Sequence, residues 1–449
     1  MKMIYNVKDK PGFGKVIVFA LQQMLAILAA TIAVPAIVGN GMSQSAALFG
    51  AGVGTIVYLL FTKFKSPVFL GSSFAFIGSM CAAFGGAVSV QAGYLGLIIG
   101  AILAGLVYVV IAIVVKFAGV NWLNKLMPPV VIGPTVAIIG LSLAGNAVKD
   151  AVGCSANFVE YSADASAYVM NTSGWVALIC GIVTLLTVIL CSVFGKKMAK
   201  LIPFIIGIVA GYIVAAIFTL IGMKTGNDAL LMIDFSKFSN MQWVPDFTFL
   251  TAIKGLSEID AEYIVTLIVA YVPVAFVVFA EHIADHKNLS SIIETDLLEE
   301  PGLHRTLLGD GVGSMIGAFF GGCPNTTYGE SVGCVAITGN ASIVTILATA
   351  ILAIIFSFVA PFTTLLATIP SCVMGGVCFT LYGFIAVSGL KMLQPVDLND
   401  NRNLFTASTI LIAGIGGMAL QILSVKLTSI ATALILGIII NLIVSRKKN

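Results

Sequence analysis

The sequence predicts an all-α membrane protein that crosses the bilayer about fourteen times. Hydrophobic residues make up 59% of the chain and charged residues 10%, whereas a soluble domain carries about 25% charged residues. The hydrophobic residues gather in runs of helix length, rather than in the alternating, roughly ten-residue stretches of an outer-membrane barrel. Basic residues favour alternate loops between these runs, as expected of a multi-pass membrane protein.

Seven apolar runs precede a polar stretch at residues 224–261, and seven follow it. We therefore expect a first repeat over residues 1–223, an extracytoplasmic connector over 224–261 and a second repeat over 262–449. Because each repeat has an odd number of crossings, the two would be inverted relative to each other. The runs lie at about 15–38, 46–62, 67–86, 92–116, 129–147, 174–195, 200–223, 262–284, 304–321, 326–338, 343–368, 371–392, 404–421 and 425–445.

The basic residues test this count. With a cytoplasmic N-terminus, fourteen crossings return the C-terminus to the cytoplasm, and the inner regions then hold 18 of the 23 lysines and arginines. This distribution follows the positive-inside rule. An error of one segment would reverse the sides of all later loops, so the agreement favours both the count and two cytoplasmic termini.

The third run of each half is interrupted by glycine and proline. One reads SPVFLGSSFAFIGSM at 66–80 and the other GGCPNTTYGESVGCVAITG at 321–339, with Phe74 and Tyr328 at matching positions. Broken segments at equivalent places in two halves indicate a transporter binding site. Unwound backbone is tolerated at membrane depth only where it is buried or lines a cavity, and there its N–H and C=O groups can bind a ligand.

Two acidic residues lie clearly within the runs, Glu281 and Glu330. A charged side chain at the bilayer centre costs about 2.5 kcal/mol or more, so such a residue usually faces a cavity and has a function. Asp285 follows Glu281 by one helical turn, on the same helix face. We expect Glu281 and Glu330 to meet at a polar site in the middle of the membrane. The alternatives are carboxyls bonded to nearby backbone or hydroxyls, and for Asp285 a helix end at the interface.

Other polar residues have less definite interpretations. His282 is either a packing and hydrogen-bonding residue or part of the coupling site, and His286 and His304 are expected in water at the cytoplasmic side. The role of Asp310, which lies in the glycine-rich start of a run, is ambiguous. The eight cysteines show no disulfide or metal-binding pattern and are interpreted as small buried hydrophobes. The sequence predicts no metal and no cofactor.

The predicted spans contain no lysine or arginine that could bind a phosphate or carboxylate. A carboxylate accepts hydrogen bonds and a protonated acid can also donate one, so the site suits a flat, neutral ligand rich in N–H and C=O groups, such as a nucleobase. An ion channel is a less favoured alternative, because the polar groups form one patch rather than a continuous pore. No nucleophile–base constellation suggests an enzyme.

Several motifs resemble the nucleobase–ascorbate transporter family, and within it the uracil-transporting bacterial members. They are LGSSFAF at 70–76, AEH at 280–282, EPGLHR at 300–305, PNTTYGE at 324–330, ESVGCVAITG at 330–339 and LYG at 381–383. The resemblance runs through most of the chain, and the combination is more specific than any single piece.

The resemblance implies a core domain from segments 1–4 and 8–11, and a gate domain from segments 5–7 and 12–14 that helps to form a homodimer. It implies that Glu281 and Glu330 bind the base and that Asp285, Glu281 and His282 take part in coupling to protons, or in some members to sodium. It also implies that the backbone around Phe74, Tyr328 and Gly329 contacts the carbonyl groups of the base. Ala30 and Tyr382 would lie at the cavity wall.

Two positions depart from the uracil-transporting pattern. Asp285 stands where those members have histidine, and Ser331 stands where the family signature has asparagine. Asp285 resembles the purine branch, so a xanthine or uric acid symporter is the alternative, whereas GSSFAF and NTTYGE favour uracil. We predict a proton-coupled importer of uracil in the cytoplasmic membrane of a bacterium, with no nucleic-acid partner.

Overall fold

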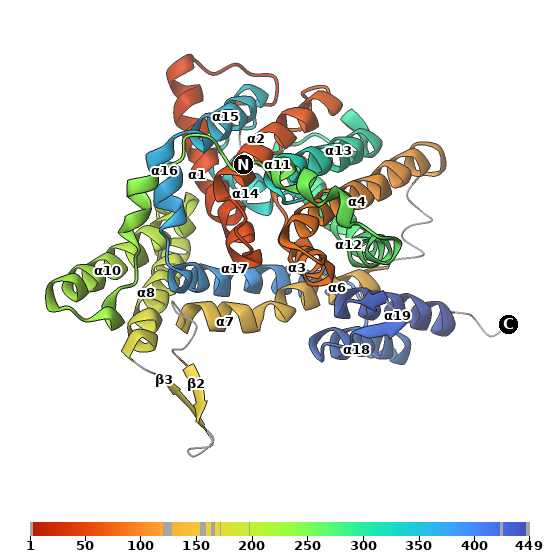
Figure 1. Ribbon diagram of the computed structural model, residues 1–449. Helices are drawn as coiled ribbons and strands as arrows, with labels where there is room; N and C mark the ends of the chain where they lie inside the picture. Colours follow the sequence, from red (N-terminus) through yellow and green to blue (C-terminus); the bar gives the residue numbers. More distant parts are fainter. Residues whose placement is uncertain are drawn as a thin grey trace. The chain divides into compact units, whose positions relative to one another are not determined.

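The computed structural model describes residues 3–119, 128–152, 159–162, 167–170, 172–196, 198–422 and 425–445, and consists mainly of helices (Figure 1). Contacts divide the chain into two compact units. Unit 1 comprises Met1–Ser142, Pro245–Ile355 and Phe384–Asn449, and unit 2 comprises Leu143–Val244 and Phe356–Gly383. The predicted core and gate domains stay a prediction.

Unit 1 contains most of the helices. Its elements before unit 2 are α1 (Phe13–Val38), α2 (Gln44–Phe61), β1 (Leu70–Ser72), η1 (Phe74–Phe76), α3 (Ile77–Gly86), α4 (Val90–Ala118) and α6 (Pro129–Ser142). Later elements are α11 (Thr248–Ala252), η4 (Ile253–Glu258), α12 (Ala261–Ile293), η5 (Leu298–Gly302), α13 (Leu303–Gly321), β4 (Asn325–Thr327), α14 (Gly329–Thr338), α18 (Asn401–Ile415), β5 (Leu420–Ile422), β6 (Val425–Leu427) and α19 (Ser429–Val444).

Unit 2 is smaller, and two helices run from one unit into the other, α15 (Ile343–Ser357) and α17 (Ser371–Met392). The elements of unit 2 are α7 (Ala144–Val152), β2 (Val159–Ser162), β3 (Ala167–Met170), α8 (Thr172–Phe194), α9 (Met198–Leu201), α10 (Pro203–Thr225), η2 (Asp228–Leu230), η3 (Phe235–Asn240) and α16 (Ala360–Ala367).

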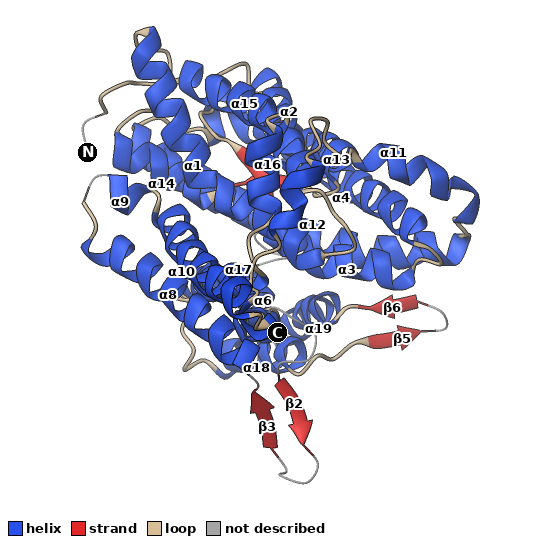
Figure 2. Cartoon of the chain, turned by 60° about the vertical axis from the view of Figure 1, so that its left-hand side comes forward, coloured by secondary structure: helices blue, strands red, loops and turns tan. Residues whose placement is uncertain are grey.

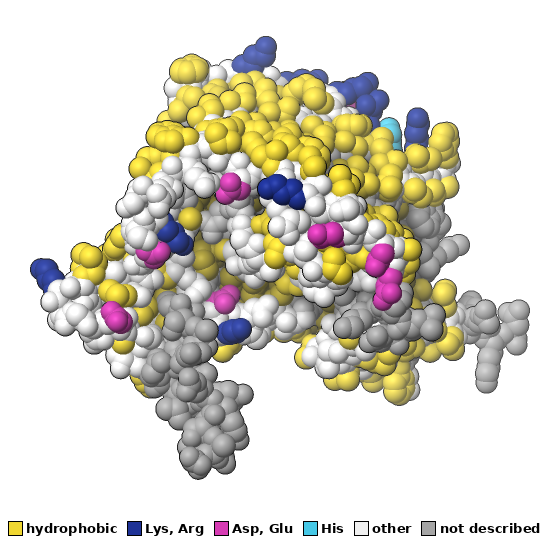
Figure 3. Space-filling model, in the orientation of Figure 1, with side chains coloured by type: hydrophobic (Ala, Val, Ile, Leu, Met, Phe, Trp, Pro, Cys, Tyr) yellow, Lys and Arg dark blue, Asp and Glu magenta, His cyan; other side chains and the backbone are white. Residues whose placement is uncertain are grey.

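In the described part of the chain, eight helices are long and apolar enough to cross a membrane, and the pair α15 and α16, bent by 81°, would make a ninth. Large hydrophobic side chains such as Trp175 and Leu190 on α8 are more than half exposed. Hydrophobic side chains also cover much of the face seen in Figure 3, where charged groups are few. The predicted helical, multi-pass membrane class is confirmed, whereas the count of fourteen crossings stays a prediction.

The two interrupted runs meet in unit 1. Strands β1 and β4 pair antiparallel, with Leu70 opposite Thr327 and Ser72 opposite Asn325, and Figure 2 shows them in red among the helices. Each strand leads directly into a helix, β1 into η1 and α3, and β4 into α14. Gly71 permits this pairing, because a methyl group there would lie 2.2 Å from the ring of Tyr328.

Small residues hold the helices around this pair close together. A methyl group at Gly50 of α2 would lie 2.5 Å from the carbonyl oxygen of Gly317 in α13, and one at Gly105 of α4 would lie 2.7 Å from that of Gly311. Such glycines let membrane helices approach at backbone distance. Asn325 of β4 is fixed against α2, because its Nδ2 donates a hydrogen bond of 2.9 Å to the carbonyl of Gly50.

Candidate substrate site

Helix α12 carries an acidic stretch that contains Glu281 and Asp285, and it begins at a defined cap. The side chain of Asp260 accepts the backbone N–H of Tyr263 at 2.7 Å, which satisfies one of the free donors at the helix start. The following apolar residues keep the chain helical for 33 residues, through Pro273, as far as Ile293. The helix therefore reaches beyond the predicted run and includes the whole acidic stretch.

Asp285 lies at the junction between α12 and the second broken segment. The hydroxyl of Thr327, the last residue of β4, donates a hydrogen bond of 2.8 Å to Asp285 Oδ2. The other carboxyl oxygen of Asp285, Oδ1, is 4.0 Å from the position that a Cβ atom would occupy at Gly329. Asp285 is thus not merely a helix-end residue, since its carboxyl contacts the turn from strand to helix.

Glu281 and Glu330 are both half-buried, on α12 and at the second position of α14. Helix α12 packs against both β4 and α14. The structure therefore places α12, which carries Glu281 and Asp285, beside the segment where Glu330 lies, and the meeting of Glu281 with Glu330 stays a prediction.

The start of α14 offers backbone donors to this neighbourhood. The first N–H groups of a helix have no partner within it, and the helix dipole makes this end partly positive. Gly329 is exposed there, whereas the side chain of Tyr328 is buried and its hydroxyl donates a 2.5 Å hydrogen bond to the carbonyl of Ser72. Tyr328 therefore joins the two broken segments through its side chain, while Phe74, at the first position of η1, is half-buried.

The two predicted wall residues lie in different units. Ala30 is 1% exposed on α1, which packs against β1 and α14 in unit 1. Tyr382 is buried on the part of α17 that belongs to unit 2. Their place in a cavity wall stays a prediction.

Two histidines of α12 face α13 and α2. His282 is fully buried, with Nδ1 2.6 Å from Oδ2 of Asp310 and Nε2 3.0 Å from the hydroxyl of Thr306. The sequence alone assigned no role to Asp310. The signal was an acidic residue in the glycine-rich start of an apolar run, but its partner His282 is 28 residues away along the chain.

The expectation that His286 lies in water is wrong. His286 is fully buried, its Nδ1 donates to the carbonyl of His282 at 2.8 Å, and its Nε2 lies 2.7 Å from the hydroxyl of Tyr58. A carbonyl only accepts, so a neutral His286 accepts at Nε2 from Tyr58. Helix α2 supplies this partner from more than two hundred residues away, which the local sequence could not reveal.

Comparison with known proteins defines the class to which this fold and site belong. A family model described as the permease family matches residues 14–423, and the chain belongs to this family, the nucleobase–ascorbate transporters. The chain is therefore a multi-pass membrane permease, and the resemblance found in the motifs is confirmed.

Its relatives include several uracil permeases. That of Bacillus caldolyticus is 41% identical over 447 residues, which cover 98% of this chain and 95% of the relative. That of Escherichia coli strain K12 is 34% identical over 440 residues, which cover 98% and 93%.

Solved structures of other transporters share the fold at low sequence identity. The transmembrane domain of the cyanobacterial bicarbonate transporter BicA has a TM-score of 0.67 at 16% identity and covers 97% of this chain and 100% of that chain. The murine anion transporter Slc26a9 has a TM-score of 0.68 at 12% identity, with coverages of 97% and 69%.

Proposed function

We propose that this permease imports uracil by proton-coupled symport, with the two broken segments and α12 forming the substrate site. The observation that carries the proposal is the hydrogen bond from the Thr327 hydroxyl to Asp285, which ties the acidic face of α12 to the end of β4, just before α14 begins. The high identity to uracil permeases over nearly the whole chain supports the choice of substrate.

Uracil presents two N–H donors and two carbonyl acceptors on one flat ring. The carboxylates of Glu281 and Glu330 would accept the N–H groups, because an ionised carboxylate accepts at both oxygens. The backbone around Phe74, Tyr328 and Gly329 would contact the carbonyls. Hydrogen bonds to charged groups contribute roughly 1.5–3 kcal/mol each, so these contacts would select for a ring with this donor pattern.

Asp285 would carry the coupled proton, together with Glu281 and His282. A carboxyl that gains a proton on the outer side and loses it on the inner side links substrate movement to the proton gradient. Sodium is the alternative coupling ion. Alternating access, with core segments moving against gate segments, completes the mechanism.

The proposed topology has fourteen crossings in two inverted repeats, with both termini in the cytoplasm and a homodimer formed through the gate domain. The two broken segments support this arrangement, because they occur at matching places in the two halves and pair with each other.

A purine such as xanthine or uric acid is the second candidate substrate. It is favoured by Asp285, which stands where uracil-transporting members carry histidine, and by Ser331 in place of the signature asparagine.

A competition panel tests the choice between these substrates. Cells that lack their own uracil uptake would express the permease and take up labelled uracil in the presence of excess xanthine, hypoxanthine, uric acid or cytosine. We expect saturable uptake that only uracil itself suppresses strongly, with the label recovered as unchanged uracil. Strong suppression by xanthine or uric acid would establish the purine alternative, and conductance without saturable uptake would indicate a channel.

A further inference from the structure

Helix α12 is held from two directions at two consecutive residues, Asp285 and His286. The hydroxyl of Thr327 donates a hydrogen bond of 2.8 Å to Asp285, and Nε2 of His286 lies 2.7 Å from the hydroxyl of Tyr58 on α2. Consecutive residues of a helix point about 100° apart, so the two contacts approach α12 from different sides. Together they determine how the helix is rotated about its axis.

The hydrogen bonds around His286 form one directed chain. Nδ1 of His286 donates to the carbonyl of His282 at 2.8 Å, so Nε2 accepts from the Tyr58 hydroxyl. The oxygen of Tyr58 can then accept from the hydroxyl of Ser66, which lies 2.7 Å away. Tyr58, Ser66 and His286 are all fully buried. A buried polar atom that loses its partner is destabilising, so the chain favours one position of the imidazole.

Helix α2 supports both sides of this arrangement. Thr55 and Tyr58 are three residues apart and therefore share one face of α2. The hydroxyl of Thr55 accepts the backbone N–H of Leu70 in β1 at 2.9 Å, and Leu70 pairs with Thr327 in β4. The same face of α2 thus holds the strand pair through Thr55 and α12 through Tyr58.

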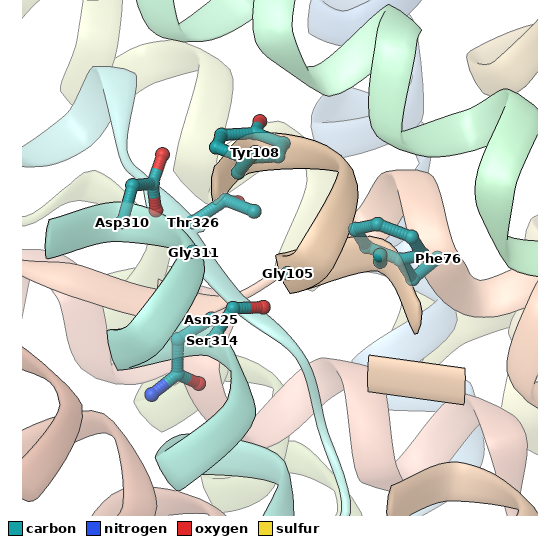
Figure 4. A pocket seen from close by; sticks show the side chains of 9 residues that line it. Phe76, Gly105, Tyr108, Asp310, Gly311, Ser314, Asn325 and Thr326 are labelled. Carbon is teal, nitrogen blue, oxygen red and sulfur yellow. The ribbon is translucent and has the colours of Figure 1, made fainter. Parts of the chain in front are cut away.

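The residues next to Thr327 in β4 pack against α13. Asn325 and Thr326 line a small buried cavity together with Asp310 and Ser314 of α13 (Figure 4). The volume open to the centre of a water molecule is about 10 Å³, which is room for about one water. Strand β4 therefore has little space in which to follow a movement of α12, and a rotation of α12 would separate Asp285 from Thr327.

These contacts close a ring that starts and ends on α2. Its members in order are Thr55, Leu70, Thr327, Asp285, His286 and Tyr58. We infer that Tyr58 and His286 are positioning residues, which hold the carboxyl of Asp285 against Thr327 by fixing the rotation of α12. They act through Asp285 and not by contact with the substrate. The inference rests on the coupling role proposed for Asp285.

Transport by the full-length protein, in cells that lack their own uracil uptake, tests the inference. Tyr58→Phe removes one hydroxyl and leaves His286 Nε2 without its donor. We expect accumulation of labelled uracil driven by an acidic exterior to fall about three- to tenfold, the factor that corresponds to one lost hydrogen bond. Exchange of labelled for unlabelled uracil should stay close to wild type, whereas a folding defect would lower both equally.

Two further comparisons separate positioning from a merely structural role. The amide oxygen of glutamine can accept from Tyr58, so His286→Gln should keep most of the accumulation that His286→Leu loses. Thr327→Val already lacks the bond to Asp285, so adding Tyr58→Phe to it should cause no further loss. Independent effects would instead multiply.

Tyr271→Phe is the matched control and should behave as wild type. Tyr271 is also a fully buried tyrosine and lies on α12, but its hydroxyl has no hydrogen-bond partner among the described residues. If His286→Leu does not fold, Tyr58→Phe decides. Wild-type accumulation in Tyr58→Phe, or a further loss when it is added to Thr327→Val, would overturn the inference. Absence of acid-driven uracil uptake in the unchanged protein would instead overturn the proposed function, and the inference with it.

Discussion

At the scale of single residues, two sides of α12 face two different environments. Glu281 and Asp285 are four positions apart and share the side towards β4 and α14, whereas His282 and His286 share the side towards α13 and α2. The helical repeat of 3.6 residues produces this separation. The shared acidic face was predictable from spacing alone, but the partners of the histidines were not, because α2 and α13 supply them from elsewhere in the chain.

Replacing Asp285 by asparagine tests its coupling role. The amide still accepts the Thr327 hydroxyl, so the local structure should persist, but it cannot take up and release a proton. We expect uracil exchange to continue while accumulation driven by an acidic exterior is lost. The measurement is labelled uptake and exchange at acidic and neutral external pH.

The control for this variant is Glu262→Gln, which removes an exposed carboxyl in the first turn of the same helix and should leave the pH dependence intact. Unchanged pH-driven accumulation in Asp285→Asn would assign the proton to another group.

At the scale of elements, most apolar runs became helices with ends close to those predicted. The run at 15–38 is α1 at Phe13–Val38, and the run at 92–116 is α4 at Val90–Ala118. The run at 343–368 is an exception, because it bends by 81° between α15 and α16. Pro361, at the second position of α16, has no N–H for a helical hydrogen bond, and its ring would clash with the carbonyl four residues earlier. A continuous helix across the bend is therefore disfavoured, and average hydropathy does not register this effect.

The close packing in the strand pair β1–β4 predicts the effect of replacing Gly71. Gly71→Ala would place a methyl group 2.2 Å from the Tyr328 ring, and forcing extra volume into a packed site costs about 1–3 kcal/mol. We expect a lower Tm and weaker uracil binding, because Tyr328 also bonds to Ser72 and precedes the first residues of α14.

Gly78→Ala is the control in the same broken segment. Its added methyl group would meet one atom, Cδ1 of Ile430, at 3.8 Å, and it lies within helix α3. It should keep or raise Tm, since alanine favours a helix by about 1 kcal/mol over glycine. A Tm for Gly71→Ala as high as that of Gly78→Ala would contradict the close packing of Tyr328.

At the scale of the whole molecule, composition was sufficient to predict a helical membrane protein, and the motifs were sufficient to predict the family. Side-chain partners distant in sequence were not predictable, as Asp310 and His286 show. The matching breaks in the two halves predicted where unwound backbone would occur, but not that Gly71 would lie under Tyr328, which depends on how the strands pair.

Cysteine labelling tests the proposed topology. Asn240→Cys, in the predicted outer connector, and Gln394→Cys, in a predicted inner loop, replace exposed polar residues. They can be introduced into a background with Cys81→Ser and Cys154→Ser, because Cys81 is exposed, contrary to the expectation of a buried cysteine, and Cys154 lies in a predicted outer loop. A membrane-impermeant maleimide should label residue 240 in intact cells and residue 394 only after permeabilisation. The reverse pattern would place the termini outside, and labelling of both in intact cells would contradict the crossing count.

The central claim is that carboxyls from α12 and α14 together bind a nucleobase. Calorimetric titration of uracil into purified Glu281→Gln and Glu330→Gln, beside Glu262→Gln as control, tests it most directly. Loss of a charged hydrogen bond worth roughly 1.5–3 kcal/mol predicts that Kd rises about 10- to 100-fold in both site variants and stays unchanged in the control. Wild-type Kd values for uracil in both Glu281→Gln and Glu330→Gln would contradict the account.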